Sequence, residues 1–357
     1  MAQNLSSSEP PQVDRNFVWL TFLLFWITLL GTIGNVKLLK QISHCAVLPP
    51  DCKTIVLSTT VSSLLVAVLG LVRVLFYHVP IALVGFQPFQ HRLGLCILLE
   101  APNSVAGTAQ FFGITATALE RLIAVLRFKL GAVPDDVNQL RSSVLIKCAM
   151  VLVWCSGLSI LVCHAFSKHH NSQLLFYCQL VTLLDFDKLV WLQSWMLLFG
   201  ASSLVTHLVV WQIAKQNWRR TMGSQSLQER FSIWQTLQVT EMLIPTVTVT
   251  TVCWTITFLI DFFAAHRFWQ YHQDTVSVNL IVLFQFFVLV DASSHPWLIL
   301  RKLFLIGRPP SSRAATPVCT TATRDVVVDF HLDPIETVAL TEQFWELQLQ
   351  GRNRMAL

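Results

Sequence analysis

The chain has 357 residues, of which 54% are apolar and only 13% are charged. A soluble domain carries roughly 25% charged residues, so this composition excludes a soluble fold and indicates that much of the apolar surface faces membrane lipid. The formal net charge of +5 is small, and no basic run interleaved with aromatic residues supports nucleic-acid binding. The nine cysteines lack metal-type spacing, so we expect no zinc site, and we expect no cofactor.

The first 16 residues are polar and include Glu9 and Asp14. A cleavable signal peptide begins with basic residues, so we expect residues 1–16 to remain as an extracellular N-terminus. Asn4 opens an N-x-Ser sequon that glycosylation would use on that side. A chance occurrence of this three-residue pattern is the alternative.

Seven apolar stretches are long enough to cross a membrane, which takes about 20 residues of helix. They are unbroken rather than alternating, which excludes a β-barrel. The predicted fold class is therefore an all-α membrane protein, a bundle of seven transmembrane helices. The predicted spans are residues 17–39, 54–77, 93–126, 144–166, 189–214, 233–263 and 275–300.

Basic residues mark the cytoplasmic side of such a bundle. The first, third and fifth connections and the segment after the last span carry an excess of Lys and Arg, which predicts an extracellular N-terminus and a cytoplasmic tail. These residues are Lys37, Lys40, Lys53, Arg127, Lys129, Arg141, Lys147, Lys215, Arg219, Arg220, Arg230, Arg301, Lys302 and Arg308.

The C-terminal residues 307–357 form a separate region. A Gly-Arg-Pro-Pro-Ser-Ser run at 307–312 ends the helical pattern. Ser, Thr and Pro then recur, which predicts a mostly disordered cytoplasmic tail with phosphorylation sites. A short amphipathic helix within 335–349 is the alternative. We expect a receptor domain over 17–306 that ends in a short cytoplasmic helix after span seven.

Short motifs recur along the spans in a defined order and spacing. Together they resemble the rhodopsin-like (class A) family of G-protein-coupled receptors, over about residues 17–306. The motifs are Gly34-Asn35-Val36 in span one, Glu120-Arg121 in span three, Trp154 in span four, Cys253-Trp254 in span six and His295-Pro296-Trp297 in span seven.

The resemblance implies one disulfide. In this family a cysteine caps the outer end of span three, 25 residues before the motif arginine, and Cys96 stands 25 residues before Arg121. Its partner lies in the loop between spans four and five, where Cys178 is the cysteine present. A disulfide persists on the oxidising side of the membrane. Two free thiols are the alternative.

Several motif positions depart from the family pattern. Leu122 replaces the aromatic residue after the motif arginine, and Ser63 stands where span two usually has an aspartate. Ile256 replaces the span-six proline, and Pro245 is an alternative source of a kink. His295 replaces the asparagine of the Asn-Pro motif. The chain is therefore predicted to be a divergent, orphan-type member, in which the departures affect the activation geometry more than the fold.

One subfamily of these receptors shares more of the motifs of this chain. Prostanoid receptors share the Glu-Arg pair at 120–121 and a Pro-Trp followed by Leu-Arg-Lys, here at 296–302. Their ligand-binding arginine in span seven corresponds to Phe286. A prostanoid-like origin thus stays open, but the sequence does not support prostanoid binding.

The resemblance also implies residues that change partner or rotamer when the receptor is activated. Arg121 pairs with Glu120 at rest and faces the G protein in the active receptor; a snorkelling interfacial arginine is the alternative. Trp254 forms the floor of the ligand cavity and reports ligand contact through its rotamer. Pro296 belongs to the corresponding motif of span seven.

Asp291 and His295 are four residues apart in span seven, on one helical face. We predict that they form a buried polar core with Asn35, Ser63 and Gln110 that shifts between two packings. A sodium ion near Asp291 is one prediction for this core, and a self-satisfied structural cluster is the alternative.

The ligand cavity is expected between the outer halves of spans two, three, six and seven. Asn103 stands where amine receptors have an aspartate, which argues against a biogenic amine, and span seven has no lysine for a retinal Schiff base. Arg73 meets either a ligand carboxylate or Glu100. Besides Trp254, the predicted ligand-binding residues are Arg73, Glu100, Asn103, Asp261 and Gln285.

These observations predict a multi-pass receptor of the plasma membrane that transmits an extracellular ligand signal to a heterotrimeric G protein, with arrestin as a partner of the tail. No catalytic constellation is evident, and His78 is assigned to the membrane interface. The alternatives are a non-signalling seven-helix transporter or scaffold and an invertebrate-type chemosensory receptor.

Overall fold

The computed structural model describes residues 13–44, 48–86, 91–129, 144, 146–155, 174–175, 186–221, 227–271 and 275–306. Side chains are not described for residues 91–101 or for the terminal parts of several other helices. Asn4, Cys178, the predicted tail at 307–357 and the side chains of Cys96 and Glu100 therefore lie outside the described part of the chain.

Long helices make up nearly all of the described chain. Six segments are long and apolar enough to cross a membrane, and a shorter apolar helix, Ile146–Cys155, falls within the predicted fourth span. Together they give the helical membrane architecture expected from the sequence. The long helices are α1 (Arg15–His44), α2 (Pro50–Arg73), α4 (Leu93–Lys129), α6 (Phe186–Thr221), α7 (Leu227–Tyr271) and α8 (Thr275–Ile306).

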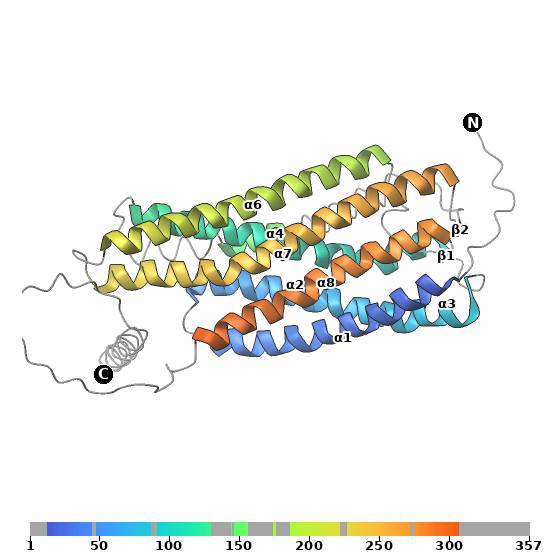
Figure 1. The fold of residues 1–357 in the computed structure, drawn as a ribbon, viewed down its shortest axis with the longest axis horizontal. Coiled ribbons are helices and arrows are strands. Elements are labelled where there is room, and N and C mark those ends of the chain that lie inside the picture. Colours follow the sequence, from blue (N-terminus) through green and yellow to red (C-terminus); the bar gives the residue numbers. More distant parts are fainter. Residues whose placement is uncertain are drawn as a thin grey trace, which may run out of the picture. The chain divides into compact units, whose positions relative to one another are not determined.

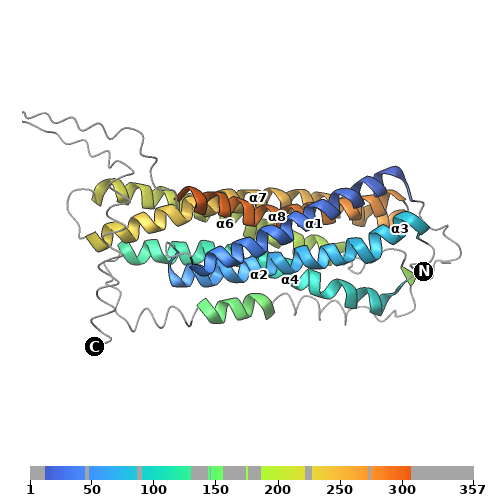
Figure 2. The same cartoon turned by 90° about the horizontal axis from the view of Figure 1, so that it is seen from below.

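The helices up to Leu300 lie side by side along their lengths (Figures 1 and 2). Helix α1 packs on α2, α2 on α4, α4 on α6, and α6 on α7. Helix α8 joins α1, because Asn35 Nδ2 donates to the carbonyl of Ala292 over 3.1 Å and Ser293 Oγ donates to the carbonyl of Ile27 over 2.9 Å.

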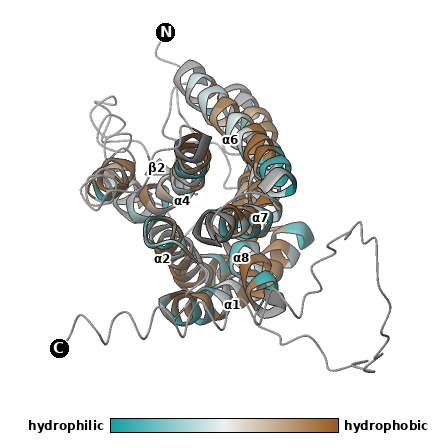
Figure 3. Ribbon diagram, turned by 90° about the vertical axis from the view of Figure 1, so that its left-hand side faces the viewer, coloured by the Kyte–Doolittle hydropathy of each residue, from teal (hydrophilic) through white to brown (hydrophobic). Residues whose placement is uncertain are grey.

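Hydrophobic residues recur along the helix ribbons (Figure 3), and many large apolar side chains are exposed on the described helices. On α1 the rings of Trp19, Phe22 and Trp26 are exposed and meet edge to face. The interior instead contains many polar side chains, among them Asn35, Gln110 and Asp291. This distribution is expected where lipid surrounds the bundle, because polar groups then find partners only between helices.

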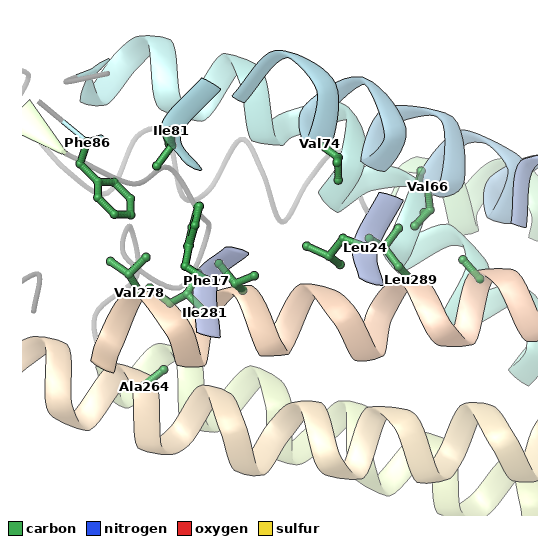
Figure 4. Packing of buried hydrophobic residues seen from close by; sticks show 13 residues of the cluster. Phe17, Leu24, Val66, Val74, Ile81, Phe86, Ala264, Val278, Ile281 and Leu289 are labelled. Carbon is green, nitrogen blue, oxygen red and sulfur yellow. The ribbon is translucent and has the colours of Figure 1, made fainter. Parts of the chain in front are cut away.

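An apolar cluster packs α1 against the second and last spans. Phe17 lies between residues of α3 (Val79–Val84) and of α8, with Ile81 and Ile281 beside it (Figure 4). Its ring meets Phe86 edge to face at 5.3 Å and stacks on the His78 imidazole at 5.9 Å between centroids. This cluster fixes the position of α1 relative to the polar interior.

A π-helical turn, η1 (Val74–His78), interrupts the second span. Pro80 follows this turn and has no N–H to donate to the preceding turn, which accounts for the local widening. The wider turn brings His78 inward, where it is 0% exposed. The sequence placed His78 at the membrane interface but did not predict that its side chain is buried, because a uniform helical repeat does not include the extra residue of a π turn.

Glycines allow three close helix contacts. A Cβ on Gly31 would lie 2.2 Å from Ser293 Oγ, and a Cβ on Gly34 would lie 2.9 Å from Trp297 Nε1. A Cβ on Gly113 would lie 2.3 Å from Thr59 Oγ1. Small residues let helix backbones approach closely in membranes. These positions therefore set the spacing of α1 to α8 and of α4 to α2.

Two further features differ from the prediction. Helix α8 continues without a break to Ile306, so the described residues contain no separate short helix after span seven; the sequence between Pro296 and Ile306 has no Pro or Gly to end the helix. Two-residue strands, β1 (His91–Arg92) and β2 (Leu174–Leu175), pair antiparallel. This ladder was not predicted, because strands this short carry no hydrophobic period.

Candidate functional site

The carboxylate of Asp291 joins three helices in the interior. Asp291 is 1% exposed. Its Oδ1 accepts a hydrogen bond from Thr250 Oγ1 over 2.6 Å. Its Oδ2 accepts one from Gln110 Nε2 over 3.0 Å and another from Trp254 Nε1 over 3.1 Å. One acidic side chain of α8 is thus bound by donors from α4 and α7.

Helical spacing explains how α7 supplies two of these donors. Thr250 and Trp254 are four residues apart and lie on one face of the helix. The sequence predicted Gln110 and Asp291 as members of one core and Trp254 as the cavity floor, but it missed Thr250. Thr250 could have been predicted from its position one turn before Trp254, which puts it on the same helical face.

The other predicted core residues are buried but do not contact Asp291. Asn35 donates to the carbonyls of Gly31 and Ala292, and Ser63 Oγ donates to the Thr59 carbonyl within α2 over 3.0 Å. Neither ring nitrogen of His295 has a hydrogen-bond partner among the described residues. The predicted core residues lie on four different helices, and they form separate contacts rather than one network.

The surroundings of Asp291 suit a hydrogen-bonded carboxylate better than a cation site. Both oxygens already accept hydrogen bonds, and two of the three donors are the N–H groups of Gln110 and Trp254. N–H groups point positive charge at the position that a cation would occupy, whereas sodium is held by oxygen ligands. No group of three or more acidic, His or Cys side chains capable of holding a metal occurs within the described ranges.

A second polar site surrounds Arg121, which is 1% exposed. Its guanidinium donates through Nε and Nη2 to both carboxylate oxygens of Glu120. Within the described part of the chain, Nη1 has no hydrogen-bond partner. The structure therefore places Glu120 and Arg121 together, as the resting pair implied by the sequence requires.

His207 of α6 lies close enough to Arg121 for their charges to interact. It is fully buried, and its Nδ1 lies 2.9 Å from the Ser203 carbonyl oxygen. Its Nε2 has no partner among the residues described. His207 was not among the residues predicted from the sequence, although a histidine within span five is a polar residue that must face the interior.

The predicted ligand-binding residues fall into two groups. In the first, Trp254 packs edge to face on Phe111 at 5.3 Å, and Asp261 lies further along α7 and accepts a hydrogen bond from Gln193. In the second, Gln285 hydrogen-bonds His78, and the Arg73 guanidinium lies 5.8 Å from the centre of the Tyr77 ring.

The order of these sites along the helices matches a known family. The profile of the family described as 7 transmembrane receptor (rhodopsin family) matches residues 34–298 of the chain. The chain belongs to this rhodopsin family of receptors. A comparison with curated proteins gave no match.

Family membership confirms the class predicted from the sequence motifs. The matched range begins at Gly34 in α1 and ends at Leu298 in α8, so it contains both polar sites described above. Members of the rhodopsin family are multi-pass membrane receptors that signal through G proteins, and they are not enzymes. The prostanoid-like features and the orphan-type assignment remain predictions.

Proposed function

We propose that this rhodopsin-family receptor resides in the plasma membrane and couples an extracellular ligand to a heterotrimeric G protein. The observation that carries the proposal is the buried ion pair of Arg121 and Glu120. A guanidinium buried with one nitrogen unpaired is costly unless a second arrangement uses it. Coupling to a G protein requires an arginine at the inner end of span three, whereas a transporter or scaffold does not.

The switch we propose exchanges the partner of Arg121. At rest the guanidinium is held by Glu120. In the active arrangement Arg121 leaves Glu120, and its N–H groups donate to the free Nε2 of His207. The inner ends of the third, fifth and sixth spans then separate and admit the G protein.

Trp254 connects the ligand to this switch. Its indole contacts Phe111 on α4 and donates to Asp291 on α8. A ligand that moves the indole breaks a hydrogen bond that joins α7 to α8. Such a ligand drives the change only by the difference in its affinity for the two states.

The remaining features of the proposal follow from the sequence. The N-terminus with Asn4 is extracellular, the tail at 307–357 is cytoplasmic and binds arrestin, and the ligand is neither a biogenic amine nor retinal. The Cys96–Cys178 disulfide rests on the family resemblance, which places one cysteine at the outer end of span three and its partner in the following extracellular loop. Family membership favours a receptor over a transporter.

The test is a measurement of basal G-protein activation in cells at matched surface levels. We expect a basal signal from the unmodified chain and its loss in Arg121→Ala, because the arginine that contacts the G protein is removed. Arg301→Ala, which removes an exposed basic residue of α8, serves as the control and should keep the signal. A wild-type signal from Arg121→Ala would overturn the proposal.

His207 gives a more specific prediction. His207→Phe fills the space but removes the acceptor for Arg121, whereas His207→Gln keeps one. A hydrogen bond to a charged group contributes about 1.5–3 kcal/mol, so we expect His207→Phe to lower basal activation roughly tenfold and His207→Gln to retain most of it. Equal activity of both variants, measured at matched surface levels, would rule out this role.

A further inference from the structure

Asp261 is a buried acid with only half of its hydrogen bonds made. It is 1% exposed, and Gln193 of α6 donates to its Oδ2. Its Oδ1 has no partner among the described residues. Asp291, by contrast, binds donors at both oxygens. A buried carboxylate oxygen without a donor costs several kcal/mol by order of magnitude, so Asp261 is not explained as a self-satisfied structural group.

Asn103 of α4 also has a buried oxygen without a hydrogen-bond donor among the described residues. Its side-chain Oδ1 is buried and has no hydrogen-bond partner in the described part of the chain. Asn103 and Asp261 therefore each present an acceptor oxygen without a donor. Two unmet acceptors in one region indicate a missing group that donates hydrogen bonds.

The neighbours of α6 indicate that these oxygens lie at a similar level of the bundle. Helix α6 contacts Asp261 through Gln193 and approaches Phe111 of α4 at Gly200, and further along the two helices His207 lies within electrostatic range of Arg121. Residues 193, 200 and 207 are seven apart, which is about two turns or roughly 10 Å of helix. Helix α4 therefore runs parallel to α6, and its residue 103 lies near the level of Gln193.

The same spacing places both residues on the correct helix faces. Asn103 is seven residues before Gln110, and Asp261 is seven residues after Trp254. Gln110 and Trp254 both donate to Asp291 Oδ2. Because two turns return a helix to nearly the same face, Asn103 and Asp261 also project between α4 and α7, toward the outer end of the bundle.

We propose that Asp261, assisted by Asn103, binds the cationic nitrogen group of the receptor's ligand, an ammonium or a guanidinium. The proposal rests on the proposed receptor function and specifies the chemistry of its ligand. A cation is favoured over a neutral donor because a charge-assisted hydrogen bond is about twice as strong and compensates the buried carboxylate. The rings of Trp254 and Phe111, two turns deeper, suit an apolar or aromatic body on the same ligand.

This geometry differs from that of an amine receptor. Amine receptors carry their acid at the position of Asn103, on the third span, whereas here the acid is on the sixth span. The cation would therefore be held by an acid of α7, with Asn103 of α4 as a neutral partner. The prediction that the ligand is not a biogenic amine remains, because it rests on Asn103 standing where amine receptors have their aspartate.

The test uses benzamidine as a cationic probe and benzamide as its neutral isostere on the purified full-length receptor. We expect benzamidine, which is a cation at pH 7, to raise the melting temperature of the unmodified receptor as its concentration increases and benzamide to leave it unchanged. Asp261→Asn should abolish the benzamidine shift. Glu241→Gln, which removes another acid of α7 that binds Trp211 instead, should retain it.

Two outcomes overturn the proposal: no benzamidine shift in the unmodified receptor, or an equal shift in Asp261→Asn. A second measurement covers the case in which a variant folds poorly. Without probe, Asp261→Asn should melt no lower than the unmodified receptor, because it removes an uncompensated buried carboxylate; a clear fall would show that the acid is structural. The basal signal that depends on Arg121 tests the proposed function separately, so loss of that signal with a normal benzamidine shift would reject coupling but not the cation site.

Discussion

Replacing Asp291 with alanine is expected to destabilise the receptor by roughly 2–5 kcal/mol and to change its basal signalling. The substitution leaves the buried donors of Gln110, Thr250 and Trp254 without their acceptor. Each unsatisfied buried donor costs about 1–3 kcal/mol, and the Thr250 hydroxyl recovers part of this cost by turning to a backbone carbonyl. Signalling changes because α7 and α8 lose the contact that holds them in the resting packing.

The measurements are the melting temperature in detergent, surface expression and basal G-protein activation. Trp254→Phe, which removes a single donor, should have a smaller effect of about 1 kcal/mol. Ser294→Ala serves as the control, because Ser294 Oγ donates only to the backbone carbonyl of Asp291. If Asp291→Ala signals and expresses like the unmodified receptor, Asp291 has no role in the switch.

Two glycine substitutions in α4 are expected to have opposite effects. In Gly113→Ala the new Cβ would lie 2.3 Å from Thr59 Oγ1 and 3.3 Å from Thr59 Cβ, so α2 and α4 must separate. Overpacking of this kind typically costs about 1–3 kcal/mol. In Gly107→Ala the Cβ meets no heavy atom within 4 Å, and the helix gains up to about 1 kcal/mol because alanine is the better helix former.

Melting temperatures of the two variants, purified in the same detergent, test this prediction. Thr59 is stiff at χ1 and its hydroxyl donates to the Ile55 carbonyl over 2.9 Å, so it does not turn away without losing a bond. Adding Thr59→Ala to Gly113→Ala should restore stability, because the clashing oxygen is removed. A Gly113→Ala variant as stable as Gly107→Ala would show that α2 and α4 do not pack this closely.

The sequence alone determined the class of protein and the positions of its helices. Runs of apolar residues fix where a chain crosses a membrane, because lipid offers backbone groups no hydrogen bonds and only helices of that length satisfy them internally. The spacing of short motifs, from Asn35 to Pro296, then indicated the receptor family, which the family match over residues 34–298 confirmed. Both signals are local along the chain and need no knowledge of contacts.

The pairing of polar residues was decided only by the tertiary structure. Asp261 and Asp291 are both acids in apolar helices, and the sequence gives no sign that one binds three donors while Gln193 is the donor found for the other. The sequence likewise did not predict that the His78 ring is buried, because it does not show the π-helical turn that contains this residue.

The physical reason is that a helical repeat tells which residues share a face but not which neighbouring face they meet. That depends on the rotation and axial position of each helix, which are set by close contacts such as Gly113 with Thr59 and Gly31 with Ser293. A shift of one residue along an axis turns a side chain by about 100°. The partners of Arg121, Asp291 and Asp261 therefore belong to the packed bundle and not to any one of its helices.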